Sequence, residues 1–131
     1  MKIVIAGNGK VGGALTGQLV AEGHDLILID SDSEALESGM EQYDIMSVQG
    51  NCASMETLRQ AGIEDADLLI ATTGSDEVNL LACMTAHALN RGLHTIARIR
   101  NPEYTDQAYM MKERFALSMD FRPNSLSVNV W

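Results

Sequence analysis

The chain has 131 residues, of which 46% are hydrophobic, and it carries a formal net charge of −9. These values fit one globular domain with a substantial core and exclude a second large domain. No apolar run approaches the roughly 20 residues of a membrane span, no signal peptide pattern is present, and the negative charge argues against a nucleic acid partner. The sequence therefore predicts a cytoplasmic protein without direct membrane insertion.

Short apolar runs alternate with helical patterns along the whole chain. The expected strands are residues 2–6, 25–30, 44–50, 67–74, 95–100 and 116–119. The expected helices are one that ends at Gly23, then residues 31–42, 54–62 and 75–92, and a last one that opens at Pro102. Nearly continuous apolar strands that alternate with helices predict a Rossmann-like, doubly wound parallel sheet of about six strands with helices on both faces.

Two features concern element boundaries. Ser31 and Glu34 have the S-x-x-E spacing of a capping box, which predicts that Ser31 opens the second helix. Residues 120–131 lose the alternating pattern, so the folded domain is expected to span residues 1–119 and to be followed by a divergent or truncated tail.

Gly7, Gly9 and Gly12 spell G-x-G-x-x-G between the first strand and the first helix. In this setting the first glycine allows a tight turn, the second lets the backbone approach a pyrophosphate, and the third allows close packing of the helix. The N-terminus of the helix then offers N–H groups and a positive dipole to a phosphate. The alternative is a glycine-rich packing turn that binds no ligand.

Asp30 ends the second strand, roughly 18 residues beyond Gly12. A carboxylate at this place accepts hydrogen bonds from both hydroxyls of an adenosine ribose and repels a 2′-phosphate. This position favours NAD(H) or an adenine nucleotide over NADP(H). The alternative role for Asp30 is that of a helix-capping acid.

Three cations lie near the expected phosphate position. Lys10 sits inside the glycine motif, where it either contacts an anionic ligand or is a solvated loop residue. Arg98 and Arg100 point to the same side of the fifth strand. They either pair with acids such as Asp76 and Glu103, which is the preferred interpretation, or reach a ligand phosphate.

Ligands of doubly wound sheets bind beyond the carboxyl ends of the strands, here between the first and fourth strands. The segment Thr72–Asp76 follows the fourth strand and supplies hydroxyls and a further helix N-terminus. The segment Gly50–Cys52 follows the third strand and is expected to line the adenine end. Neither the two cysteines nor the three histidines have metal-ligand spacing, so free thiols and no metal site are predicted.

The segments "KIVIAGNGKVGGAL", "HDLILIDSD", "GIEDADLLIATTGSDEVNLLAC" and "TIARIRNPEY" resemble the KTN or RCK N-terminal (TrkA-N) domain of Trk-type potassium transport regulators. The resemblance extends from residue 1 to about 119. It implies a cytosolic, non-enzymatic regulatory domain that binds NAD(H) or ATP/ADP and controls a membrane potassium transporter or channel. Such a domain lies peripheral to the inner membrane through a potassium-translocating partner subunit.

The resemblance also implies roles for individual residues. Gly7, Gly9, Lys10 and Gly12 match the phosphate loop, Asp30 the ribose carboxylate, Asn51 and Cys52 the adenine-side turn, and Thr73 and Gly74 the loop over the second phosphate or ribose. The residues expected to form the nucleotide site are Gly7, Asn8, Gly9, Lys10, Val11, Gly12, Asp30, Ser31, Asn51, Cys52, Thr72, Thr73, Gly74, Asp76, Asn79 and Arg98.

Self-association is a further expectation. Leu80, Leu81, Met84 and Leu89 cover more than one stripe of the long helix. This apolar surface is either buried centrally or used to form a homodimer or larger oligomer, and the resemblance places a pairing surface there.

Two other functions compete with nucleotide sensing: an NAD-dependent oxidoreductase fragment and a nucleotide-free interaction module. The oxidoreductase would need a substrate pocket and a proton donor, and the sequence shows neither a substrate domain nor a Tyr-x-x-x-Lys pair.

Overall fold

One parallel sheet organises the chain, and its strand order is β3-β2-β1-β4-β5-β6. The computed structural model describes residues 1–114 and 119–123, with side chains described up to residue 111. The strands are β1 (Lys2–Ala6), β2 (Asp25–Asp30), β3 (Met46–Gln49), β4 (Leu68–Ala71), β5 (His94–Ile99) and β6 (Met119–Pro123). All five neighbouring pairs are parallel, which confirms the predicted Rossmann-like sheet.

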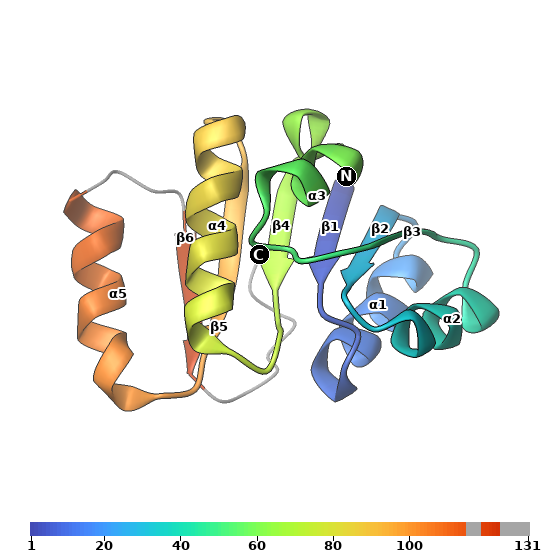
Figure 1. Cartoon of the computed structure of the whole chain (residues 1–131), viewed down its shortest axis with the longest axis horizontal. Helices are drawn as coiled ribbons and strands as arrows, with labels where there is room; N and C mark the ends of the chain where they lie inside the picture. Colours follow the sequence, from blue (N-terminus) through green and yellow to red (C-terminus); the bar gives the residue numbers. More distant parts are fainter. Residues whose placement is uncertain (115–118, 124–131) are drawn as a thin grey trace.

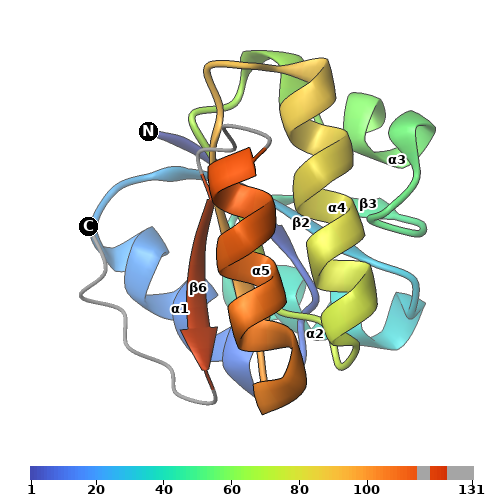
Figure 2. The same cartoon turned by 90° about the vertical axis from the view of Figure 1, so that its left-hand side faces the viewer.

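Helices cover both faces of the sheet (Figure 1). They are α1 (Lys10–Ala21), α2 (Ser33–Gln42), α3 (Met55–Gln60), α4 (Asp76–Leu89) and α5 (Pro102–Arg114), with a short 3₁₀ helix, η1, at Ile63–Asp65. One hydrophobic cluster joins α1 and α2 to one face, and another joins α3, α4 and α5 to the opposite face. Figure 2 shows α4 and α5 side by side on their face.

The alternation of side chains along β1 explains the two clusters. Ile3 and Ile5 enter the cluster under α1 and α2, whereas Val4 and Ala6 enter the cluster under α3 and α4. All four side chains are 0–1% exposed, because a central parallel strand is covered on both faces. The topology reverses between β1 and β4, which places the carboxyl ends of these two strands at the predicted switch point.

The start of α2 differs from the expected capping box. The N-cap is Asp32, whose Oδ1 accepts a hydrogen bond from the backbone N–H of Glu34 at 3.0 Å. The prediction that Ser31 caps the helix is therefore wrong. Serine and aspartate are both good N-caps. Because α2 begins at Ser33, the residue at the N-cap position is Asp32 and not Ser31.

The last strand lies later than expected. It runs over Met119–Pro123 and pairs with β5, so residues 120–123 of the expected tail belong to the sheet. Residues 116–118 of the strand predicted at 116–119, and residues 124–131 of the tail, lie outside the described part of the chain.

The broad apolar surface of α4 is used mainly within the domain. Leu80 is buried in the cluster on its side of the sheet, and Met84 and Leu89 pack partly buried against that cluster. Ala108 and Tyr104 of α5 belong to or contact the same cluster. Only Leu81 of the four apolar residues expected at a pairing surface is strongly exposed, at 53%. Within the described residues, no helix has the length and apolar character needed to span a membrane.

Candidate functional site

The turn after β1 requires its glycines. Gly7 has a φ of 99°, in the left-handed region that favours glycine, and a Cβ there would lie 3.0 Å from the backbone nitrogen of Thr73. A Cβ at Gly12 would lie 1.8 Å from the carbonyl oxygen of Gly7. A Cβ at Gly9 would meet nothing within 4 Å. The first and third glycines are therefore required by packing, whereas the second faces open space.

The N-terminus of α1 is suited to an anion. Its N-cap is Gly9, no described side chain caps it, and its first turn contains no acidic residue. The helix has 12 residues, so its N–H groups and dipole together place positive potential at the turn. The exposed residue Lys10 adds a cation at the same end.

Asp30 is held by backbone donors on both carboxylate oxygens. Its Oδ2 accepts from the backbone N–H of Asn8 at 2.8 Å, and its Oδ1 accepts from the backbone N–H of Asp32 at 2.9 Å. Each carboxylate oxygen can accept a further hydrogen bond. Because Asp32 caps α2, Asp30 is not the N-cap of that helix, and its half-buried carboxylate faces the cavities beside β1.

Two cavities lie at the carboxyl ends of the strands and share Gly7, Asp30 and Thr73. The smaller, of about 200 Å³, is lined by Gly7, Ile29, Asp30, Ser31, Gly50, Asn51, Cys52, Thr73 and Val78. The larger, of about 480 Å³, is lined by Gly7, Gly9, Lys10, Val11, Asp30, Thr72, Thr73, Gly74, Arg98 and Arg100. Figure 1 shows the loops after β1 and β4 at the same edge of the sheet.

The smaller cavity is the more apolar end of the site. Cys52 is buried at its wall, and burial raises the pKa of this thiol to about 11, with a smaller contribution from the charge of Asp30. Asn51 uses its Oδ1 to accept from the backbone N–H of Ala53 at 3.0 Å, which stabilises the turn after β3. Ser31 is exposed at the rim.

The loop after β4 is shaped by Asn79, which is fully buried. The Oδ1 of Asn79 accepts from the backbone N–H and from the hydroxyl of Thr73, at 2.8 and 2.7 Å. Its Nδ2 donates to the carbonyl oxygens of Thr73 and Arg98. Thr72 is also buried, and its hydroxyl donates to the carbonyl oxygens of Ala6 and Gly7. Asn79 is therefore enclosed behind the loop, where it supports the site.

Arg98 of β5 and Arg100, which directly follows β5, do not form ion pairs with Asp76. The carboxylate of Asp76, which is 8% exposed, accepts from the backbone N–H groups of Arg100 and Asn101 at 3.0 and 2.7 Å. The guanidinium of Arg98 donates to the carbonyl oxygen of Thr73 at 3.0 Å, and that of Arg100 donates to the carbonyl oxygen of Gly74 at 2.5 Å. The preferred interpretation, in which these arginines pair with acids such as Asp76 and Glu103, is thus wrong. Among the described residues neither guanidinium forms an ion pair with either acid, because both are directed to carbonyl oxygens of the loop after β4.

The pair of arginines leaves positive charge at the larger cavity. The Nε of Arg98 is buried and has no hydrogen-bond partner among the described residues. Desolvation, followed by the neighbouring charge of Arg100, lowers the pKa of Arg98, and the charge of Asp76 opposes this shift in part. Two guanidinium groups that donate to carbonyl oxygens are not neutralised by those contacts.

Most of the predicted site residues line the two cavities. Asn8, Asp76 and Asn79 do not line them and instead hold neighbouring backbone in place. Gly12 acts through its contact with Gly7. Arg100 lines the larger cavity but was not among the predicted site residues, although its alternation with Arg98 along the strand was a usable signal. Within the described residues, no cluster of acidic, histidine or cysteine side chains is arranged for a metal ion.

Sequence comparisons identify relatives over most of the chain. A family model described as the TrkA-N domain matches residues 3–118. The Trk system potassium uptake protein TrkA of Haemophilus influenzae is 46% identical over 104 residues, which cover 79% of this chain and 23% of that protein. The protein of the same name from Vibrio alginolyticus is 38% identical over 120 residues, 92% of this chain and 26% of that protein. The chain thus spans about a quarter of the length of these relatives.

Solved structures share the fold. The TrkA-N domain of the inner membrane protein ybaL from Escherichia coli superposes with a TM-score of 0.80 at 25% identity, covering 94% of this chain and 87% of that chain. The GsuK channel bound to NAD superposes with a TM-score of 0.77 at 21% identity, covering 93% of this chain and 21% of that chain. At that identity the second match establishes a common fold alone.

Proposed function

The chain belongs to the TrkA-N domain family, and from this premise we propose that it is a non-enzymatic nucleotide-sensing domain that regulates a membrane potassium transporter or channel. Its ligand is NAD(H) or ATP/ADP. The relatives that carry the name of a potassium uptake protein are matched over only 23–26% of their length, so the role in potassium transport is part of the proposal. The proposal places the domain in the cytoplasm, attached to the inner membrane through its partner subunit.

The observation that carries the proposal is the position of Asp30. Its carboxylate lies between the smaller, apolar cavity and the uncapped N-terminus of α1. An adenine in the smaller cavity would bring its ribose to Asp30 and its phosphates to the glycine turn. A 2′-phosphate would meet the carboxylate directly, which disfavours NADP(H).

Positive groups around the larger cavity support an extended phosphate chain. The N-terminus of α1, Lys10, Arg98 and Arg100 surround it. Charge-assisted hydrogen bonds to phosphate are stronger than bonds to neutral carbonyl oxygens, so a phosphate can compete for the two guanidinium groups. The GsuK channel, which has the same fold, was solved with NAD bound. The ligand proposed for this chain is nevertheless argued from the residues of this chain.

Parallel calorimetric titrations with NADH, NAD, ATP, ADP and NADPH test the proposal. Binding of at least one of the first four, with much weaker binding of NADPH, is the expected result. Absence of binding by all five nucleotides would contradict the proposed function. Oxidation of NADH coupled to reduction of candidate substrates would contradict the non-enzymatic part and favour the oxidoreductase alternative.

Lys10→Ala is expected to reduce the affinity for ATP more than the affinity for ADP. Lys10 lies at the end of α1 where distal phosphates are placed, and its charge is attracted more strongly to the additional phosphate of ATP. Titration of the wild type and the variant with both nucleotides gives the ratio of variant Kd to wild-type Kd for ATP and for ADP. Equal losses for ATP and ADP, or no loss, would mean that Lys10 is a solvated loop residue.

Self-association of the domain is the second expectation of the proposal. Three exposed apolar side chains on the outer helices, Leu81 of α4 and Tyr109 and Met110 of α5, are 53–55% exposed. Burial of such side chains in a dimer is favourable, and a two-fold contact uses one surface of each copy. Light scattering at micromolar concentration should detect a dimer, and Leu81→Glu should shift it toward monomer. A wild-type chain that stays monomeric with and without NADH or ATP would contradict the pairing.

A further inference from the structure

Asn8 occupies the first variable position of the glycine motif, yet its side chain points away from the nucleotide cavities. Its Nδ2 donates to the carbonyl oxygen of Ala35, in the first turns of α2, at 2.5 Å. Its backbone N–H donates to the Oδ2 of Asp30 at 2.8 Å. One residue therefore connects the glycine turn, the Asp30 carboxylate and α2.

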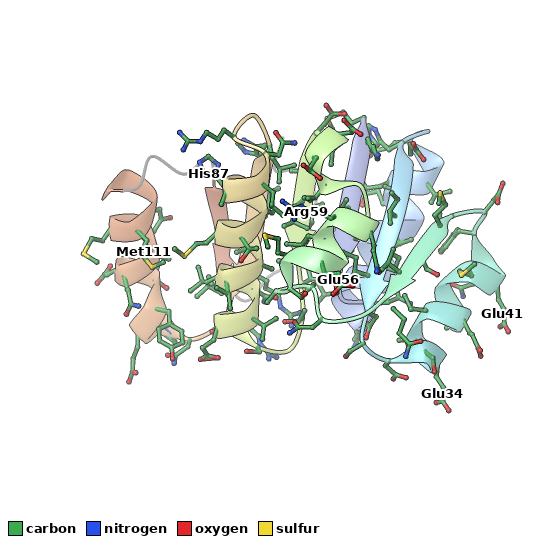
Figure 3. The ribbon with its side chains drawn as sticks, turned by 45° about the horizontal axis from the view of Figure 1, so that its top comes forward. Glu34, Glu41, Glu56, Arg59, His87 and Met111 are labelled. Atoms are coloured by element: carbon green, nitrogen blue, oxygen red, sulfur yellow. The ribbon has the colours of Figure 1, made fainter. Side chains whose placement is uncertain are left out.

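Gly39 makes room for this connection. Glycine inside a helix lowers helix stability relative to alanine, and Gly39 is the seventh of the ten residues of α2. A Cβ at Gly39 would lie 3.1 Å from the Nδ2 of Asn8 and 2.9 Å from a methyl carbon of Leu28. The labelled acids Glu34 and Glu41 point outward from α2 in Figure 3. The glycine is thus on the inner side of the helix, where Asn8 and β2 approach it.

The same helix supplies the second donor to Asp30. The backbone N–H of Asp32, the N-cap of α2, donates to the Oδ1 of Asp30 at 2.9 Å. One carboxylate oxygen is thus fixed from the glycine turn and the other from α2. The bond between Asn8 and Ala35 joins these two supports directly, so it sets their relative position.

We propose that Asn8 is a positioning residue that holds the Asp30 carboxylate in the orientation needed to accept hydrogen bonds from both ribose hydroxyls of the ligand. The inference rests on the proposed function, because it concerns the same nucleotide site. Its consequence is that Asn8 controls discrimination between ribose and 2′-deoxyribose without touching the sugar.

Calorimetric titration with ADP and 2′-deoxy-ADP tests this role. The wild type should prefer ADP by about tenfold or more, as expected for one hydrogen bond to a charged acceptor. In Asn8→Ala the preference should fall to about threefold or less, mainly through weaker ADP binding. Gly39→Ala should have the same effect, because its added methyl group displaces the Asn8 amide.

Tyr43→Phe is the matched control. The Tyr43 hydroxyl, at the C-cap of α2, is the atom that a Cβ at Gly17 of α1 would meet at 2.6 Å, and its removal leaves the Asn8–Ala35 bond intact. This variant should keep the wild-type preference for ADP. Thermal unfolding of each variant shows whether it is folded at the titration temperature.

The outcomes separate the inference from the proposed function. Equal affinity of the wild type for both nucleotides, or no binding of either, would contradict the ribose site and the inference together. A wild-type preference that disappears in Asp30→Ala but persists in folded Asn8→Ala would overturn the inference alone. A parallel loss of affinity for ADP and 2′-deoxy-ADP in Asn8→Ala would also overturn it, because that is the result of a purely structural role.

Discussion

Asp30→Ala is expected to weaken the binding of NADH and of ATP by about 1.5–3 kcal/mol, roughly one to two orders of magnitude in Kd. Both ligands contain an adenosine ribose, whose hydroxyls the proposal assigns to this carboxylate, so both should lose the same charged acceptor. Titration of the wild type and of Asp30→Ala with NADH and with ATP measures the change in Kd. Unchanged affinity for both would remove Asp30 from the site.

Two further substitutions test whether the loss of affinity comes from the Asp30 carboxylate itself. Asp32→Ala removes a carboxylate two residues away that caps α2 but lines neither cavity, so it should reduce stability more than affinity. Asp30→Asn removes the charge and keeps a side chain of similar size, so it should lessen the discrimination against NADPH. A variant that still rejects NADPH as the wild type does would show that the carboxylate is not the cause of that rejection.

Gly12→Ala is expected to destabilise the fold by about 3 kcal/mol or more, the upper end of overpacking effects. The new Cβ would lie 1.8 Å from the carbonyl oxygen of Gly7, and backbone cannot move away as a flexible side chain can. For a domain of this size, the loss corresponds to a decrease in Tm of roughly 10 °C. Thermal unfolding followed by circular dichroism measures it.

Gly9→Ala is the matched substitution in the same motif. Gly9 has a φ of −77°, which alanine readily adopts, and its Cβ would meet nothing within 4 Å. We therefore expect a change in unfolding free energy within about 0.5 kcal/mol, typical of a surface substitution. Nucleotide affinity should nevertheless fall, because the methyl group would occupy the surface to which the proposal assigns the phosphates. Similar destabilisation by both substitutions would contradict the distinction between the two glycines.

Much of the fold was predictable because buried parallel strands leave a strong pattern. The runs at β1, β2 and β4 are nearly continuous in apolar residues, and the helices between them fix the parallel order. Boundaries were less predictable. The choice between Ser31 and Asp32 as the cap of α2 depends on where the helix meets the sheet, which local sequence does not encode.

The glycine turn after β1 was predictable because its backbone geometry dictates the residue type. At Gly7 and Gly12 a side chain would collide with backbone atoms, and the G-x-G-x-x-G motif places glycine at both positions. Partners of polar side chains were not predictable in the same way. Asp76 accepts from the backbone N–H groups of the turn after β5, whereas the guanidinium groups of Arg98 and Arg100 donate to carbonyl oxygens of the loop after β4. The paths of these two loops decide between the possible partners, and the local sequence does not show those paths.

The reactivity of the two buried cysteines can be used to measure local opening of the fold. Cys83 is 1% exposed between α4 and the sheet, and burial raises the pKa of its thiol to about 12. A thiol reagent can reach it only after α4 has separated from the strands. Cys52 lies at a cavity wall, so local movement of the turn after β3 is enough to expose it. The rates at which the two thiols are modified therefore report two different opening free energies of the same unlabelled native chain.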